Sequence, residues 1–159
     1  MSIFKKRKNS PIIEDKINAL LSGDARNALD WAAFLWANGL KIEWNPRHNG
    51  WKFTYRNKLV GTVYVAGADY ELIVNFCTRD FDGGGPADDD LKEFVWAHAT
   101  VCPHGCGAAT ICERSQKNIS IFGKEYENIC ITPLMIINPD VKDLGYAKKL
   151  VLMLKQNQT

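Results

Sequence analysis

The stretch "LKIEWNPRHNGWKFTYRNKLVGTVYVAGADYELIVNFC", residues 40–77, decides the fold class. Apolar and polar residues alternate in "LKIEWN" and "WKFTYR", and two more apolar runs, "LVGTVYVA" and "YELIVNFC", follow short breaks. A period of two is typical of half-buried strands. Asn49-Gly50 is a hairpin signal, and Asn57-Lys58 separates the next two strands. Because these connections are too short for a crossover helix, we expect an antiparallel meander.

Helical periodicity flanks this stretch on both sides. Apolar residues recur at helical spacing between Ser10 and Gly23, and again between Asp24 and the stop signal at Asn38-Gly39. Downstream, "LKEFVWAHA" and the amphipathic C-terminal segment after Asp140 predict two more helices.

Three acids precede "LKEFVWAHA" at positions 88–90, and we interpret them as an N-cap that complements the helix dipole rather than as a cation site. The segments "NISIF" and "EYENICITPLMII" predict further strands. The sequence therefore predicts an α+β fold, with an antiparallel sheet of about four to six strands packed against helices. Two helices are N-terminal to the sheet and one is C-terminal.

Length and charge limit the organisation and the partners. With 159 residues and 46% hydrophobic residues, the chain can bury one core, so we expect a single domain over residues 10–159. Residues 1–9, which contain Lys5, Lys6, Arg7 and Lys8, are predicted to form a flexible basic tail. A net charge of only +2 argues against a dedicated nucleic-acid binder.

The sequence also predicts a cytoplasmic protein without a membrane partner. No apolar run approaches the roughly 20 residues of a membrane span. The start "MSIFKKRKNSP" has no apolar core after its charges, unlike a secretory signal. In a reducing compartment, clustered cysteines are expected to be thiols or metal ligands rather than disulfides. The odd count of five cysteines agrees with this expectation.

The strand block also resembles a known family. The segment "EWNPRHNGWKFTYRNKLVGTVYVAGADYELIVNF", with "IFGKEYENIC" and "KDLGYAKKLVLMLK" downstream, resembles short bacterial proteins of the domain of unknown function 3788 type. The resemblance covers residues 25–155 and includes members with a cysteine cluster before a segment like "IFGKEYENIC". It implies an α+β fold and carries no established activity.

The stretch "VCPHGCGAATIC", residues 101–112, is the strongest candidate site. Two thiolates two to four residues apart can chelate one zinc ion from a single turn, and glycines allow the tight backbone that such a turn needs. We therefore predict one structural zinc ion, with His104 as an alternative fourth ligand. The predicted cysteine ligands are Cys102, Cys106, Cys112 and Cys130.

Other interpretations of the same cysteines stay open. Buried cysteine packs as a small hydrophobe, and Cys112 and Cys130 both have isoleucine neighbours. A thiol enzyme or redox sensor would need a base, for which His98 and His104 are the local candidates. Cys102 is expected to follow the C-terminal end of a helix, where the dipole raises a thiol pKa, and this argues against Cys102 as the nucleophile.

These patterns favour a binding or interaction module with a structural zinc site over an enzyme. A protein partner or a second copy of the chain fits this interpretation. The first alternative is the thiol enzyme or redox sensor. A second is a small-ligand binder that uses an aromatic sheet face formed by Trp44, Trp51, Phe53 and Tyr64.

Overall fold

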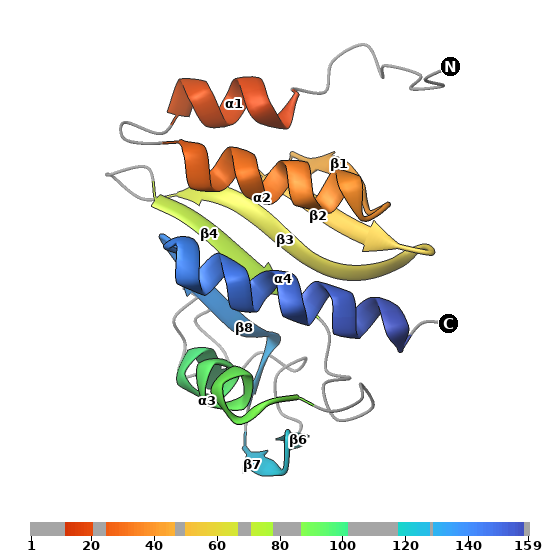
Figure 1. The fold of residues 1–159 in the computed structure, drawn as a ribbon, viewed down its shortest axis with the longest axis vertical. Helices are drawn as coiled ribbons and strands as arrows, with labels where there is room; N and C mark the ends of the chain where they lie inside the picture. Colours follow the sequence, from red (N-terminus) through yellow and green to blue (C-terminus); the bar gives the residue numbers. More distant parts are fainter. Residues whose placement is uncertain are drawn as a thin grey trace.

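A computed structural model of the chain confirms the α+β fold. Its main element is a six-stranded antiparallel sheet with the order β1-β2-β3-β4-β8-β5, and a separate two-stranded sheet pairs β6 with β7 (Figure 1). The structure describes residues 12–20, 25–46, 50–66, 71–77, 87–101, 118–127 and 129–157.

The first four strands form the expected antiparallel meander. They are β1 (Lys41–Asn45), β2 (Gly50–Tyr55), β3 (Lys58–Ala66) and β4 (Glu71–Phe76). Trp51 of β2 lies opposite Trp44 of β1 and Val63 of β3, so these side chains share one face of the sheet. The turn between β2 and β3 consists of Arg56 and Asn57, both with positive φ (49° and 64°), one residue earlier than expected.

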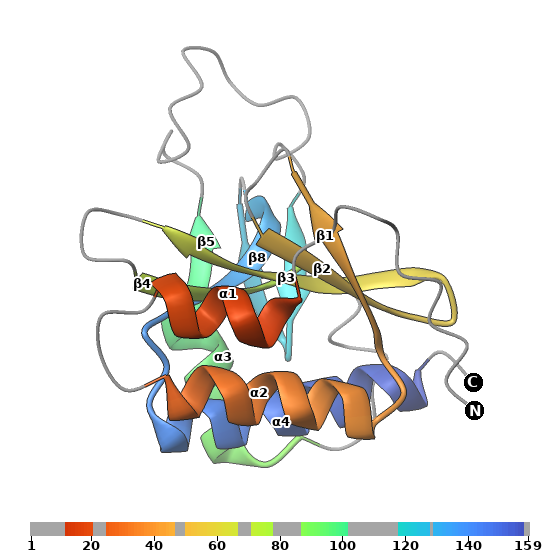
Figure 2. The same cartoon turned by 90° about the horizontal axis from the view of Figure 1, so that it is seen from above.

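Four helices accompany the sheet in the described part of the chain. They are α1 (Ile13–Leu20), α2 (Arg26–Ala37), α3 (Asp89–His98) and α4 (Val141–Gln156). Figure 2 shows α2, α3 and α4 on one side of the sheet. Helices α2 and α4 run in the same direction, because Asn27 near the start of α2 donates to the Pro139 carbonyl just before α4, and the Asn38 carbonyl after α2 accepts from Lys155 near the end of α4. None of the helices in the described ranges is both long and apolar enough to cross a membrane.

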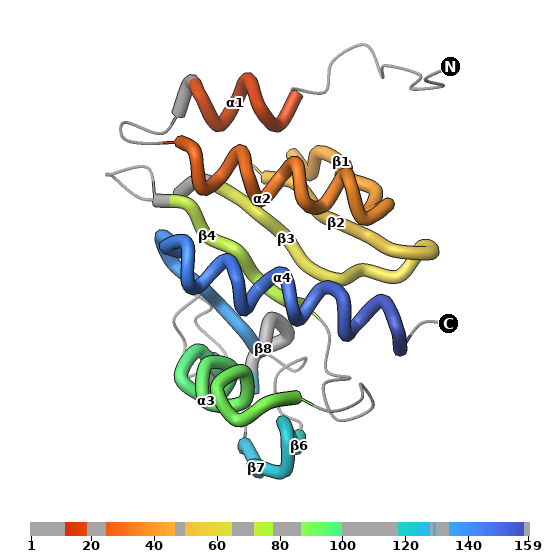
Figure 3. Tube along the Cα trace, viewed as in Figure 1, coloured from red at the N-terminus to blue at the C-terminus, as the bar shows by residue number. Residues whose placement is uncertain are grey.

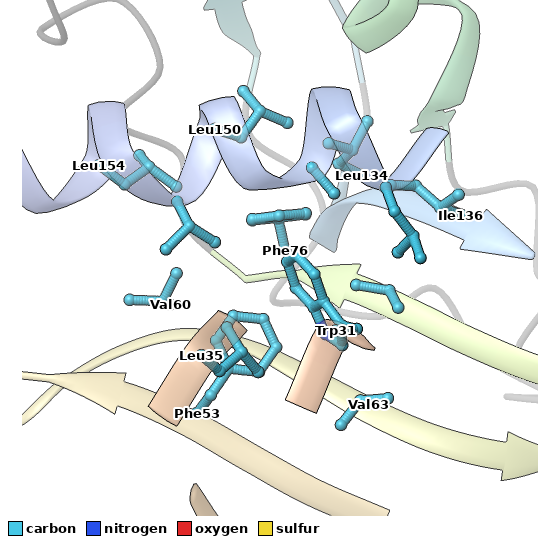
Figure 4. Close-up of a cluster of buried hydrophobic side chains, with 14 of the residues drawn as sticks. Trp31, Leu35, Phe53, Val60, Val63, Phe76, Leu134, Ile136, Leu150 and Leu154 are labelled. Atoms are coloured by element: carbon cyan, nitrogen blue, oxygen red, sulfur yellow. The ribbon is translucent and has the colours of Figure 1, made fainter. Parts of the chain in front are cut away.

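The core lies between α2, α4 and the sheet, with Trp31 of α2 at its centre. The Trp31 side chain is fully buried and meets Phe53 and Phe76 edge to face, at ring centroid distances of 5.9 and 6.4 Å. Figure 4 shows side chains from both helices and from the sheet, including Leu134 and Leu150, converging around Trp31. Burial of each large apolar side chain contributes about 1.5–3 kcal/mol, so this cluster holds the two layers together.

Strand β8 (Ile129–Ile137) connects the first four strands to the segment that contains α3 and β5. It lies between β4 and the short edge strand β5 (Ala99–Val101), and Figure 3 shows it beside β4. Leu134 is the Cα partner of both Phe76 and Ala99. The register with β5 shifts between Ala99 and Val101, next to Pro133. Proline has no N–H to donate to a ladder and occurs in sheets mainly at edges and bulges, which agrees with this irregularity.

Asn138 connects the end of β8 to the start of β4. It adopts a left-handed conformation (φ 48°), which asparagine tolerates better than most residues. Its N–H donates to the Leu72 carbonyl at 2.7 Å, and its side-chain oxygen accepts from the Leu72 N–H at 3.0 Å. Two residues later Asp140 caps α4 in a reciprocal capping box with Asp143.

Strands β6 (Ile119–Ile121) and β7 (Lys124–Tyr126) form the separate hairpin. Their turn consists of Phe122 and Gly123, both with positive φ (49° and 82°). The sequence predicts strands in this region, but their separation from the main sheet was not expected.

The Gly61→Ala variant tests the contact between β3 and its two neighbours. A Cβ at Gly61 would overlap the Asn75 carbonyl oxygen and the Phe53 ring. We expect the variant to lose about 1–3 kcal/mol of unfolding free energy, because overpacking forces the backbone to shift. Urea denaturation measures the loss. Gly145→Ala in α4 is the control, since a Cβ there meets no atom of the described chain within 4 Å and should add about 0.5–1 kcal/mol. Equal effects at the two glycines would contradict the packing argument.

The Arg56→Asn variant tests the strain in the β2–β3 turn. A left-handed backbone costs most L-residues about 1–2 kcal/mol, and asparagine less. We therefore expect Arg56→Asn to raise the unfolding free energy by up to about 1 kcal/mol. Lys58→Asn removes the same charge at an extended position and should give no gain. Thermal denaturation of the two variants compares them, and a gain in both would show that charge, not strain, is responsible.

Acid titration tests the cap of α3. The Asp88 carboxylate accepts from the Leu91 N–H at 2.8 Å and from the Lys149 ammonium at 3.2 Å. These contacts, the Leu91 hydrogen bond first, hold the pKa of Asp88 below its ordinary value of 3.8. The stabilisation is therefore present above pH 3.8 and is lost as the pH falls through the lower folded pKa.

Asp88→Asn keeps a capping side chain but removes the charge. The stability difference between the natural chain and this variant should be constant at neutral pH and shrink below pH 3.8. Chemical denaturation at a series of pH values measures it. A difference that persists unchanged in strong acid would contradict the assignment.

Candidate functional site

Helix α3 precedes the predicted metal site in the sequence and contacts two other elements, α4 and β6. The Phe94 ring stacks on Tyr146 of α4, with ring centroids 4.7 Å apart. On another side, the Trp96 indole N–H donates to the Ile121 carbonyl of β6 at 2.7 Å. The position of α3, and of the strand β5 that follows it, is therefore set by packing against both α4 and the β6–β7 hairpin.

The β5–β8 pairing includes the residues that directly precede two predicted ligands. Val101, the last residue of β5, is the Cα partner of Ile129, the first residue of β8. Cys102 follows Val101 in the chain and Cys130 follows Ile129. The register therefore describes the backbone of β5 up to the residue before Cys102.

The other predicted ligands are not placed. Cys106, Cys112 and His104, together with Cys102, lie outside the described residues, and for Cys130 only the backbone is described. The described ranges contain no group of three or more His, Cys, Asp or Glu side chains that could hold a metal ion. The zinc site stays a prediction.

One expectation about Cys102 stays a prediction, because Cys102 lies outside the described residues. Helix α3 ends at His98, close to the expected end, and the three-residue strand β5 follows it. The field of a helix dipole falls off within the last turn. The described residues therefore add no support to the dipole argument against Cys102 as a nucleophile.

The His98 ring has a defined tautomer. Its Nδ1 lies 2.8 Å from the Phe94 carbonyl oxygen, and because a carbonyl only accepts, Nδ1 carries the hydrogen. In the neutral ring Nε2 then carries the lone pair, which is the form that accepts a proton or binds a metal. The half-buried ring also contacts the Phe94 ring, with centroids 4.4 Å apart.

The aromatic set proposed for a small ligand is divided between the two faces of the sheet. Trp44 and Trp51 contact each other at 4.9 Å and lie on the helix face, and Phe53 is fully buried in the core. Tyr64 is the partner of Gly50 and lies on the opposite face.

A hollow near these residues measures about 160 Å³, open solvent included, compared with about 300–1,000 Å³ for typical ligand pockets. It is lined by Asn45, Gly50, Trp51, Thr62, Val63 and Tyr64. This part of the described sheet therefore does not form a site for a drug-sized ligand.

Two further side chains that could take part in chemistry lie in β4 or directly after it. Cys77 directly follows β4, is half-buried, and its N–H donates to the Val60 carbonyl at 2.9 Å. Asn75 is only 4% exposed, on the face opposite the helices, and its side-chain oxygen has no partner among the described residues. Sequence reasoning missed Asn75, although a polar residue within the apolar run "ELIVNF" was a usable signal.

Charged side chains protect the edge strand β1. Glu43 lies 2.8 Å from the ammonium of Lys41 and 3.6 Å from that of Lys52 on β2. The Lys41 hydrogen bond is the main reason that the pKa of Glu43 is lowered, while partial desolvation acts in the opposite direction. Charges on an edge strand discourage pairing with other strands, and they leave a surplus of cations at this edge.

The chain matches no protein-family model, and no similar protein was found among the curated proteins or the solved structures. Function is therefore argued from the residues and their geometry.

Proposed function

We propose that the protein is a binding or interaction module in which a structural zinc ion clips the cysteine-rich segment to the sheet. The proposed ligands are Cys102, Cys106, Cys112 and Cys130, with His104 as the alternative fourth. The main support is the pairing of Val101 with Ile129, because each of these residues directly precedes one of the cysteines.

The same register favours a metal clip over a direct disulfide. If the antiparallel pairing continues by one residue in each direction, Cys102 and Cys130 become diagonal neighbours with Cα atoms about 7–8 Å apart. A disulfide usually requires a Cα separation below about 6.8 Å. A tetrahedral zinc ion with Zn–S bonds of about 2.3 Å lies between the thiolates and bridges a longer separation.

A clip at this position would stabilise a weak part of the sheet. Strand β5 has three residues, lies at the sheet edge, and has only two described Cα partners, Leu134 and Ile129, separated by a register shift. Metal ligands are rarely preformed in an unfolded chain, so zinc binding would contribute directly to folding. The clip would fix the end of β5, and through it α3, on β8.

A thiol enzyme or redox sensor is the second candidate function. One observation favours it: the tautomer of His98 gives Nε2 the lone pair that a general base needs. In this case one thiolate reacts much faster than the others at neutral pH. Timed alkylation followed by mass spectrometry tests it, and uniformly slow reaction of the folded protein would exclude it.

Elemental analysis tests the zinc clip. Protein purified without chelator should contain about one zinc per chain, and Cys130→Ser should lower the zinc content and the melting temperature. Cys77→Ser is the matched control, because Cys77 follows β4 and is outside the proposed ligand set. Chelator should destabilise the natural chain and the control alike. Metal-free natural protein, or equal zinc content in both variants, would overturn the proposal.

A further inference from the structure

Helix α1 depends on other elements for its own stability. It has eight residues, Ile13–Leu20, and isolated helices shorter than about 12–15 residues are marginal in water. Figure 1 shows α1 beyond α2, at the end of the fold opposite the β6–β7 hairpin. The helical form of α1 therefore requires that it stays docked on the rest of the domain.

Two isoleucines anchor α1 in the core. Ile13 and Ile17 are only 3% and 1% exposed, and their spacing of four residues places them on one side of the helix. Both belong to the main hydrophobic cluster, and α1 packs against α2. Among the described side chains of α1, only these two are buried. The apolar part of the docking is therefore small.

One polar contact joins α1 to the sheet. The Lys16 ammonium lies 6.0 Å from the centroid of the Trp44 ring on β1, and Trp44 in turn contacts Trp51 on β2. This separation is near the outer limit of an effective cation–π contact. Within the described ranges, α1 makes no ion pair or side-chain hydrogen bond with another element. Polar interactions therefore add little to the docking of α1.

Helix α4 is connected to the domain far more extensively. Lys149 pairs with Asp88, the N-cap of α3, and Lys155 donates to the Asn38 carbonyl at the end of α2. Buried side chains extend along α4 from Leu144 to Leu154. Elements with few buried contacts open at a lower free energy than the one that unfolds the whole domain. By this criterion α1 is the helix that opens first.

We propose that α1 is a strap that opens and closes independently of the rest of the domain. Opening withdraws Lys16 from the half-buried Trp44 ring and exposes more of this ring to solvent, whereas the core around Trp31 stays packed. The strap thus controls access to Trp44 at the edge of the sheet. The proposal goes beyond the interaction module proposed above and does not depend on the zinc clip.

Native-state hydrogen exchange with Ile136→Val decides whether α1 opens alone. In the natural chain, the amides of α1 should exchange at least about tenfold faster than the slowest amides of β3 and α4, relative to their unfolded rates. Ile136 is fully buried in β8, so Ile136→Val should accelerate exchange in β3 and α4 about two- to tenfold. The α1 amides should keep their rate, because the open strap leaves the contacts of Ile136 intact. Equal acceleration of α1 would overturn the proposal.

Ile17→Asp holds the strap open, because an unpaired carboxylate is too costly to bury. Hydroxyl-radical footprinting should then show more oxidation of Trp44 than in the natural chain, while Trp31 stays protected and the slow exchange in β3 and α4 persists. Ile12→Asp is the matched control, since it places the same charge on an isoleucine that is 48% exposed, and it should leave Trp44 unchanged.

Two outcomes of this comparison would contradict the strap. Loss of slow exchange in β3 and α4 on Ile17→Asp would show that α1 is an integral part of the domain. Equal oxidation of Trp44 in Ile17→Asp and Ile12→Asp would show that α1 does not cover this ring. Zinc content affects neither measurement at the N-terminal end of the fold, so failure of the zinc clip and failure of the strap are distinguishable.

Discussion

The pairing of β8 with strands on both of its edges is the constraint on which the rest of the structure depends. Leu134 lies opposite Phe76 of β4 on one side and Ala99 of β5 on the other. This arrangement joins the N-terminal meander to α3 and places α4 over the same face of the sheet as α2. Phe76 also contacts Trp31, so the strand pairing and the helix packing stabilise each other. The proposed zinc clip depends on this register, because Ile129 of β8 pairs with Val101 of β5.

The main elements of the fold are predictable from local patterns. Alternation in the β1–β4 stretch, helical spacing around Trp31 and acids before α3 all act within a few residues, and the structure agrees with each. The place of β8 is not predictable in this way, because its Leu134 pairs with a residue of β4 far away in the chain. Strand β5 is also missed, since three residues are too short for a period to be recognised.

The candidate site likewise combines features that local sequence patterns predict with features that depend on long-range pairing. Spacing predicts Cys102 and Cys106 as a chelating pair, and the sequence adds Cys130 because it lies on an expected strand. The pairing of that strand with β5 is a long-range feature that spacing does not predict.

The two hydrogen bonds between Asn138 and Leu72 have a consequence for the folding rate. The two residues are 66 positions apart, whereas the hairpins of the meander connect strands that are adjacent in sequence. Contacts between residues far apart in sequence cost loop-closure entropy before they contribute any favourable free energy. The meander with α2 can therefore form early, and the arrival of β8 is expected to limit the folding rate. Until then this edge of β4 lacks its partner strand, so its backbone groups can pair with other strands during synthesis.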